Sequence, residues 1–243
     1  MWIGIDDTDS RRGGCTTYLG GVLLSKIQKL GVHLIGFPRL VRLNPNVPWK
    51  TRGNGGVSFQ IGVGSGSPNN IGRINGSDVL SYPTMKKQID DAVLIDKIKK
   101  VLLHEIESLA ELSNDNTNPG LVITFDRFDE SWYWDAVHHI IEKDEIVSFL
   151  NEKDAWFQEF KNGRGIIGAT GSIAWTGNHD HTFELIAYRK KKRWGSSRDI
   201  DEDSVIKMDK TCPTTFDNYD YVNHHVNIMP HSPCPVLFGI RGD

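Results

Sequence analysis

Residues 2–10, WIGIDDTDS, decide how this chain begins to fold. The apolar run Trp2–Ile5 has the length and β-branched content of a buried strand, and apolar residues recur at helical spacing from Thr17 to Leu30. The acids between them therefore lie on a turn that joins a strand to a helix. Ligands of open α/β sheets bind beyond the carboxyl ends of strands, so this turn is a candidate binding site.

Three carboxylates lie on this turn, those of Asp6, Asp7 and Asp9. Carboxylates suit Mg²⁺, which prefers oxygen ligands and takes water and nucleotide phosphates as the rest of its shell. We therefore predict that the three aspartates are catalytic and hold Mg²⁺ on a nucleotide polyphosphate. The alternative is that they only solvate the turn, a role for which one acid would be enough.

The start of the predicted helix forms a second part of this candidate site. Its unpaired N–H groups at Thr16 and Thr17 and the positive end of its dipole favour a bound phosphate. The alternative is that Thr16 only caps the helix. The residues expected to contact phosphate in this segment are Thr8, Ser10, Gly13, Gly14 and Thr17.

A second dense segment, residues 38–56, reads PRLVRLNPNVPWKTRGNGG and places four cations among prolines and glycines. Prolines restrict the backbone, and glycines let the main chain approach a ligand closely. Taken alone, a cationic loop is usually a solvated loop, but the acid-rich turn favours a bound polyphosphate. The residues expected to bind the phosphates of this nucleotide are Arg39, Arg42, Gly53 and Asn54. Those expected to act in catalysis, by stabilising charge on the transferring phosphoryl group, are Lys50 and Arg52.

The composition excludes several classes of protein. Among 243 residues, 28 Lys and Arg face 31 Asp and Glu, and the net charge of −3 argues against a bulk electrostatic binder of nucleic acid. No apolar run is long enough to span a bilayer, so no membrane partner is expected. The three cysteines are isolated, which excludes a four-cysteine zinc site and suits reduced thiols in the cytoplasm.

Periodicity predicts a βαββαβ order followed by a second α+β unit. Strands are expected at 2–5, 32–43, 56–63 and 121–125, and helices at 17–30 and 86–112. The polar stretch 64–78 is expected to be a mobile or active-site loop, with disorder as the alternative. Later helices are expected at 131–143, 145–160 and 165–175, and β-rich segments at 183–189, 204–208, 220–228 and 236–240.

Two further groups of residues have a functional and an ordinary interpretation. Residues 189–194, RKKKRW, place an aromatic beside five cations, a pattern that can grip an RNA backbone and stack a base, or form a solvated strand end. The histidine pairs 138–139 and 224–225 lack a matching acid motif. We expect them to be hydrogen-bonded or solvent-facing rather than metal ligands.

Taken together, the motifs resemble the archaeal 2-agmatinylcytidine synthetase family that acts on an isoleucine tRNA. The resemblance spans nearly the whole chain. It is carried by GIDDTDS, GGCTTYL, PRLVRLNPNVPWKTRGNG, TNPG at 117–120, GRGIIGA at 163–169, FELIAYR at 183–189, TFDNYD at 215–220 and PCPVLFGIRG at 233–242.

The resemblance implies two mixed α/β domains, so the expected fold class is α+β (α/β-like). A kinase-like domain is expected at residues 1–118 and a ferredoxin-like domain at 119–243. The implied enzyme is a cytoplasmic, ATP-dependent ligase that attaches agmatine to C2 of the wobble cytidine in an isoleucine tRNA with a CAU anticodon, through a phosphorylated cytidine. The threonine that becomes phosphorylated maps to Thr16. Family members normally continue into an OB-fold and a zinc ribbon, and neither is expected within residues 1–243.

Agmatine is a dication, so its pocket should offer carboxylates to the guanidinium group. The candidates are Asp126, Asp217 and Asp220, and turn capping is the alternative role for each.

Two other functions remain open from the residues. One is a non-catalytic module that binds RNA or DNA, and the other is a small-molecule kinase that uses the same ATP site. The acid-rich turn argues against the first, because a simple nucleic-acid binder gains nothing from three carboxylates where phosphates would lie.

Overall fold

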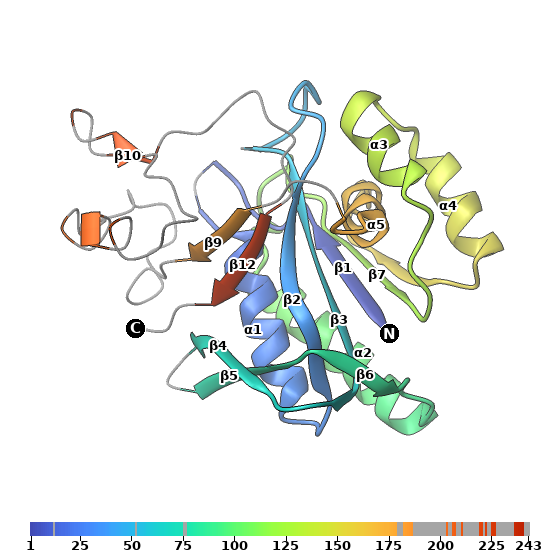
Figure 1. The fold of residues 1–243 in the computed structure, drawn as a ribbon. Coiled ribbons are helices and arrows are strands. Elements are labelled where there is room, and N and C mark those ends of the chain that lie inside the picture. Colours follow the sequence, from blue (N-terminus) through green and yellow to red (C-terminus); the bar gives the residue numbers. More distant parts are fainter. Residues whose placement is uncertain are drawn as a thin grey trace.

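The computed structural model describes residues 1–178 apart from 12, 52, 75 and 76, and, in the C-terminal part, residues 182–186, 203, 206–207, 210, 219–220, 222, 225–226 and 236–240. Its centre is a large mixed sheet with helices on both faces (Figure 1). The helices are α1 Thr16–Gln28, α2 Ala92–Leu109, α3 Ser131–His138, α4 Lys143–Glu152 and α5 Gly165–Ala174. The strands are β1 Trp2–Asp6, β2 His33–Arg42, β3 Gly55–Ser65, β4 Asn69–Ile74, β5 Ser77–Tyr82, β6 Thr84–Lys87, β7 Gly120–Thr124, β8 Trp156–Glu159, β9 Thr182–Ile186, β10 Tyr219–Asp220, β11 His225–Val226 and β12 Val236–Ile240.

The direction of the strands decides which loops meet at the end of β1. The described sheet runs in the order β8-β7-β1-β3-β2-β5-β4-β12-β9, and β6 pairs with β3. Both neighbours of β1 are antiparallel to it. The carboxyl end of β1 therefore lies beside the amino ends of β3 and β7, and not beside the carboxyl ends expected in a parallel sheet. The loops that precede β3 and β7 approach the acids there.

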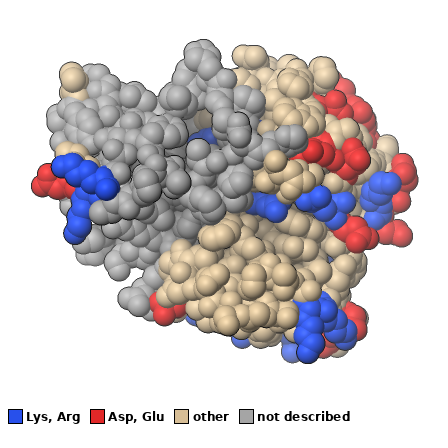
Figure 2. Space-filling model, in the orientation of Figure 1, with Lys and Arg blue, Asp and Glu red and all other residues tan. Residues whose placement is uncertain are grey.

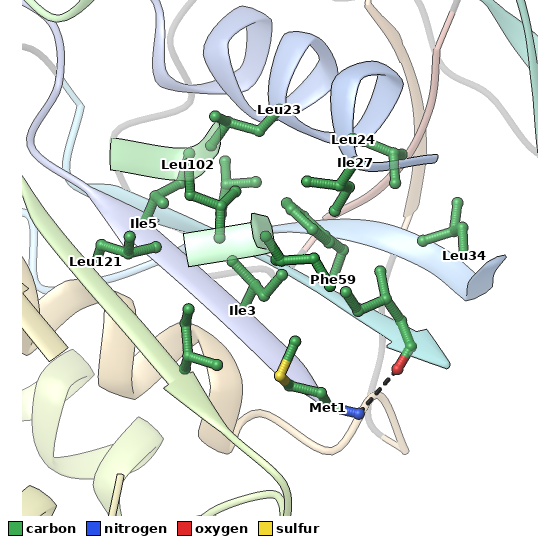
Figure 3. Close-up of a cluster of buried hydrophobic side chains, with 14 of the residues drawn as sticks. Met1, Ile3, Ile5, Leu23, Leu24, Ile27, Leu34, Phe59, Leu102 and Leu121 are labelled. Carbon is green, nitrogen blue, oxygen red and sulfur yellow. Dashed lines mark hydrogen bonds between the residues drawn. The ribbon is translucent and has the colours of Figure 1, made fainter. Parts of the chain in front are cut away.

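Alternation along the strands separates two cores. Ile3 and Ile5 of β1 pack with α1 and α2 in an aliphatic cluster, in which Leu23 and Leu102 are fully buried (Figure 3). The amino group of Met1 is buried beneath it and donates a hydrogen bond of 2.8 Å to the carbonyl of Ile61. Burial lowers the pKa of this amino group to about 6, against the opposing charge of Asp126.

The other face of the sheet is covered by α5, which α3 and α4 flank (Figure 1). Glycines on both sides let the backbone of α5 reach the backbone of the sheet. A Cβ atom at Gly120 of β7 would overlap the backbone at Ile166, and one at Gly56 of β3 would lie 2.5 Å from the carbonyl of Gly168. Such distances exclude any side chain at these positions, so α5 docks through main-chain contact.

The α+β class is confirmed, and most expected elements are present. The expected strands 2–5, 32–43, 56–63 and 121–125 correspond to β1, β2, β3 and β7, and the helix expected at 165–175 corresponds to α5. The strand expected at 236–240 matches β12.

Four expectations about elements were wrong. The stretch 64–78 is mainly strand, because β4 and β5 form an antiparallel hairpin there. The helix expected at 86–112 begins at Ala92, where Asp91 caps it by accepting from the N–H groups of Val93 and Leu94. The helix expected at 145–160 stops at Glu152, and β8 pairs with β7 instead. In the segment 204–208, the described residues 206 and 207 are helical.

The division at residues 118 and 119 stays a prediction. β7 and β8, which follow that point, pair in the same sheet as β1. Among the described residues, no helix combines the length and apolar character needed to cross a membrane.

Candidate active site

The acids lie on the acid loop, which we define as residues 6–14. This loop leaves the carboxyl end of β1 and enters α1, whose first residue is Thr16. Hydrogen bonds tie it to two other segments that converge here, the loop before β3 and the residues before β7. The amino end of α5 closes the same region, because Gly165 donates from its N–H to the carbonyl of Asn118 at 3.0 Å.

Asp6 lies on the side of the site that α5 closes. A Cβ atom at Gly168 would overlap the Asp6 carboxylate, so the two are in direct contact. Burial, followed by the charges of Asp7 and Asp9, raises the pKa of Asp6 well above its usual range. Asp6 therefore depends on the absence of a side chain at Gly168.

Asp7 adopts an unusual backbone conformation and holds two neighbouring segments. Its φ is 56°, in the left-handed region that Asn and Asp tolerate better than most residues. Its carboxylate accepts a hydrogen bond of 3.0 Å from the N–H of Asn118. Burial raises its pKa to about 6, the charge of Asp9 acts in the same direction, and the Asn118 bond and the charge of Arg164 oppose them.

Asp9 joins the acid loop to its neighbours. Its carboxylate accepts a hydrogen bond of 2.7 Å from the hydroxyl of Thr51, and its carbonyl accepts one of 2.7 Å from the hydroxyl of Thr117. The hydrogen bond from Thr51 thus connects the cationic segment 38–56 to the acids. The sequence predicted that these two segments act together.

The hydroxyl groups of the loop are largely internal. The buried Thr8 donates to the hydroxyl of Thr16 at 3.0 Å, while the thiol of Cys15 lies 2.9 Å from the hydroxyl of Thr17.

The turn itself is closed by main-chain hydrogen bonds between Ser10 and Gly13. Gly14 has a φ of 77°, and a Cβ atom there would lie 2.9 Å from the Cα of Asp9. The glycine thus allows the tight turn that leads into α1.

The proline loop, which we define as residues 43–54, is held at its base. Leu43 donates from its N–H to the carbonyl of Asn54 at 3.1 Å, and the Asn54 side chain donates to the carbonyl of Asn44 at 2.9 Å. The ammonium group of Lys50 donates to the carbonyl of Pro45. Asn54 and Lys50, both expected to act on phosphate, thus also shape the loop.

The two arginines of β2 lie in different places. Arg42 is close to the proline loop, because a Cβ atom at Gly53 would lie 3.3 Å from its guanidinium. Arg39 is not at the acids: it lies between the rings of Trp2 and Trp175, 4.7 and 5.4 Å from their centres, and donates to the carbonyl of Trp175 at 2.7 Å. Burial lowers its pKa to about 10, and the charge of Arg127 adds to this effect. The structure therefore gives Arg39 a packing role and does not support the phosphate contact predicted for it.

Of the residues predicted to bind agmatine, Asp126 is far from the acid loop. It follows β7, whose end pairs with Trp2 at the opposite end of β1. The strand is five residues long, which corresponds to roughly 15 Å. Asp126 thus lies away from the acid loop, and its assignment to agmatine stays a prediction. Arg52, Asp217 and the side chain of Asp220 lie outside the described residues, as do residues 189–194.

The structure adds site residues that the sequence analysis missed. Thr51, Thr117 and Asn118 hold the acid loop by the hydrogen bonds given above. Arg164, the residue before α5, acts electrostatically on Asp7, and its guanidinium lies 4.0 Å from the centre of the Trp49 ring. The motifs that contain these residues were visible in the sequence, but their convergence depends on the antiparallel neighbours of β1.

The predicted metal site of Asp6, Asp7 and Asp9 is only partly supported. Among the described residues, no group of three His, Cys, Asp or Glu side chains is arranged to hold a metal ion, since Asp6 is turned toward α5. Asp7 and Asp9 fit the usual binding of Mg²⁺ by one or two carboxylates together with phosphate oxygens. The charges of Asp7 and Asp9 raise the pKa of Asp6, and the charge of Asp9 raises the pKa of Asp7, so a cation here would relieve this repulsion.

An acid-rich loop between a strand and a helix start, closed by a cationic loop, is typical of α/β enzymes that handle nucleotide phosphates. Comparisons with known proteins specify the family. Residues 2–162 match the model of the TiaS TCKD domain, and residues 163–243 match that of the TiaS FLD domain. The chain belongs to the TiaS family.

Relatives and solved structures agree with this assignment. The chain is 40% identical to the isoleucine-tRNA 2-agmatinylcytidine synthetase TiaS of Methanocaldococcus jannaschii, over 100% of this chain and 52% of the relative. A crystal structure of TiaS in complex with its isoleucine tRNA and ATP is 33% identical, with a TM-score of 0.68 over 98% of this chain and 51% of that one. A complex of TiaS with the same tRNA, AMPCPP and agmatine is 31% identical, with a TM-score of 0.66 over 98% and 52%. The chain thus spans about half the length of the curated relatives it matches.

Proposed function

We propose that this chain catalyses the ATP-dependent attachment of agmatine to C2 of the wobble cytidine in an isoleucine tRNA with a CAU anticodon. The observation that carries the proposal is the convergence of the acid loop, the start of α1 and the proline loop in a member of the TiaS family. The names of its relatives, which specify this synthetase, and the solved TiaS complexes with the isoleucine tRNA, ATP and agmatine support it.

The start of α1 is the part of the site suited to the ATP phosphates. Its first-turn N–H groups have no partners within the helix, and the dipole favours an anion there. Cys15, which precedes the helix, makes no side-chain capping bond. Arg42, Lys50 and Arg52 are the cations we assign to the phosphates from the proline-loop side.

Asp7 and Asp9 are the carboxylates we assign to Mg²⁺, and Asp6 supports them from the α5 side. When bound, Mg²⁺ would screen the phosphate charge that otherwise repels these acids. The hydrogen bonds of Asn118 and Thr51 orient the two carboxylates, so these residues act through Asp7 and Asp9.

The proposed chemistry has two steps. O2 of the cytidine first attacks the terminal phosphorus of ATP: the O2–P bond forms, the P–O bond to the bridging oxygen breaks, and the nucleoside diphosphate leaves. The primary amine of agmatine then attacks C2: the C2–N bond forms, the C2–O2 bond breaks, and O2 leaves with the phosphate. The amine gives up one proton, which the departing phosphate can carry. We place this activity in the cytoplasm, in keeping with the reduced thiol of Cys15.

Thr16 is the residue we assign as phosphate acceptor on the protein. It is 8% exposed, and its hydroxyl accepts a hydrogen bond from Thr8, so its side chain must rotate to receive a phosphoryl group. Thr17, which is more exposed, is the matched control. Mass spectrometry after treatment with ATP should show phosphate on Thr16 and none in Thr16→Ala. Phosphate that persists on Thr17 in that variant would transfer the role to Thr17.

The experiment that tests the activity combines the protein with ATP, Mg²⁺ and agmatine, with and without the isoleucine tRNA. Formation of 2-agmatinylcytidine is expected, and Asp7→Asn should abolish it while Asp96→Asn, an exposed acid on α2, leaves it intact. Lys50→Ala should lower kcat by about 10²-fold, as removal of one preorganised charge commonly does. ATP turnover that ignores tRNA would favour a small-molecule kinase.

Binding of tRNA without any ATP turnover would leave only a nucleic-acid-binding module. On the face shown in Figure 2, the Lys, Arg, Asp and Glu side chains of the described residues are interspersed, without the broad basic patch that such a module uses.

A further inference from the structure

One aromatic side chain next to the site, that of Trp49, is not among the residues assigned to metal or phosphate. Trp49 lies in the proline loop, between Pro48 and Lys50, and is 40% exposed. An exposed indole costs free energy because its apolar surface stays in water, and an isolated one needs no explanation. Trp49 differs from an isolated aromatic because of what covers it.

The guanidinium of Arg164 lies 4.0 Å from the centre of the Trp49 ring. Arg164 is the residue before α5, more than a hundred positions away in the sequence, so the pair joins the proline loop to the α5 side of the site. Its Nε atom is buried and has no hydrogen-bond partner among the described residues. Its charge also acts on Asp7. The Trp49 indole is thus in cation–π contact with an arginine whose charge acts on the acid loop.

The support of the loop keeps this indole in place. The hydrogen bonds from Asn54 to Asn44 and from Thr51 to Asp9 hold the loop on both sides of Trp49. Two prolines, at positions 45 and 48, restrict the backbone leading to it. A ring held in this way loses little conformational freedom when a ligand stacks on it.

We propose that Trp49, with Arg164 behind it, stacks a nucleobase of a substrate bound at the acid loop. Aromatic rings and arginine planes are the groups on which proteins stack unpaired bases, and stacking accepts any base because each has a π-face. This inference rests on the proposed function, in which two substrates carry a base: ATP and the tRNA with its wobble cytidine. The third substrate, agmatine, has no base, so a change in its Kd in the Trp49 variants would indicate a cation–π contact or a displaced loop and not base stacking.

The test measures affinity for each substrate separately in the wild type, Trp49→Ala and Trp49→Phe. Stacking of a base is worth about 1–3 kcal/mol, so Trp49→Ala should weaken one base-bearing substrate by about 5- to 150-fold. Trp49→Phe should retain most of the affinity, and the Kd of agmatine should not change. Weaker binding of ATP alone identifies adenine as the stacked base, and weaker binding of an anticodon stem-loop alone identifies the cytidine.

A spectroscopic readout separates stacking from a purely structural role. The chain has 7 tryptophans, so the fluorescence of Trp49 is obtained as the difference between wild type and Trp49→Phe. Quenching of this difference by the stacked substrate, and not by agmatine, is expected. The matched control for Trp49→Ala is Phe125→Ala. Phe125 is another exposed aromatic, and it follows β7 at the far end of β1.

Four outcomes would overturn the inference, three of them in the variants and one in the wild type. Affinities for ATP and the stem-loop that stay within about twofold in Trp49→Ala exclude stacking, because a stacked base is worth more than that. An equal loss for all three substrates also excludes it, since it indicates a displaced loop. A Trp49→Phe variant as weak as Trp49→Ala contradicts it as well. A wild type that binds both base-bearing substrates but forms no product would refute the proposed function alone, while one that binds neither would refute both.

Discussion

The two faces of the sheet are covered in different ways. On one face, α1 and α2 lie on a layer of large aliphatic side chains, among them Ile5, Leu23 and Leu102 (Figure 3). On the other, α5 reaches the main chain of the sheet through glycines, including Gly56 and Gly120. Side chains fill the first interface, whereas their absence makes the second possible.

This difference in packing corresponds to the position of the candidate site, which the amino end of α5 closes. Aliphatic packing keeps a helix away from the sheet by the depth of a side-chain layer, and interaxial spacing can adjust to the side chains present. At α5 the glycines allow the helix start to reach Asp6 and bring Arg164 to Asp7. We therefore expect the aliphatic face to tolerate changes of shape and the α5 face to tolerate almost none.

The largest effect is expected from Gly168→Ala. The added methyl group would overlap the carboxylate of Asp6, the last residue of β1, so the helix must move or the carboxylate must turn away. We expect the free energy of unfolding to fall by about 4 kcal/mol or more, which is at the upper end for single substitutions.

Gly171→Ala on the same helix is the control for Gly168→Ala. Its methyl group would lie 3.0 Å from the Cβ of Ala136, and the gain in helix propensity of about 1 kcal/mol offsets the crowding. Urea denaturation of both variants measures the difference. Equal losses would mean that the glycines do not set the distance between α5 and the sheet.

On the aliphatic face, Leu102→Ala should cost about 2–5 kcal/mol, because it leaves a cavity in a fully buried position. Leu102→Met keeps the volume and should cost less than about 1.5 kcal/mol. Urea denaturation of both Leu102 variants measures the difference in stability. A Met variant as unstable as the Ala variant would show that this face also requires an exact fit.

Asp7→Asn should stabilise the protein at pH 7 in the absence of Mg²⁺. The folded-state pKa of about 6 is above the usual 3.8, so the folded protein binds this proton more tightly, and stability falls as pH rises from about 4 to about 6. The loss amounts to as much as about 3 kcal/mol. Asn tolerates the left-handed backbone and carries no charge, so the variant should lack most of this decline.

Thermal melts of both proteins from about pH 4 to pH 7, the range over which this carboxyl titrates, measure the effect of Asp7→Asn. Added Mg²⁺ should raise the Tm of the wild type more than that of the variant. Parallel pH profiles would remove Asp7 as the titrating group.

The smallest effect is expected at the ion pair between α1 and α2. Lys26 and Glu105 are 3.1 Å apart, and the lysine side chain is 49% exposed. Partly exposed pairs contribute about 0–1 kcal/mol, so Glu105→Gln should shift stability by less than about 1 kcal/mol and less still at high salt. A larger loss that persists in salt would mean that the two helices depend on this pair and not on their aliphatic layer.

Sequence reasoning succeeded where a local pattern determines the structure. The apolar run Trp2–Ile5 and the helical period after it predicted β1 and α1, and the acids between them lie where they were expected. It failed for β4 and β5, since this hairpin has few apolar residues and its polar composition is that of a loop. It also extended a helix through residues 156–159, because a short apolar run does not distinguish helix from strand.

The site residues show even more clearly that local sequence patterns predict local structure but not contacts between distant segments. Arg39 and Arg164 both lie in motifs that the sequence makes visible, and only the fold shows that the first packs between two tryptophan rings while the second reaches Asp7. Likewise, the spacing of Gly165 and Gly168 indicates a helix with one face that lacks side chains, but it does not indicate which strands that face contacts. Contacts between distant segments depend on strand order, which local periodicity does not encode.

The docking of α5 also has a mechanical consequence. Atoms of two backbones already in van der Waals contact resist compression steeply, and at Gly120 the nearest atoms of α5 are main-chain atoms that cannot rotate away to take up the change. Movement of the helix away from β1 meets no such barrier. The junction therefore resists compression more steeply than separation, and separation is opposed instead by the loss of core packing at buried side chains of α5 such as Ile166 and Ile173.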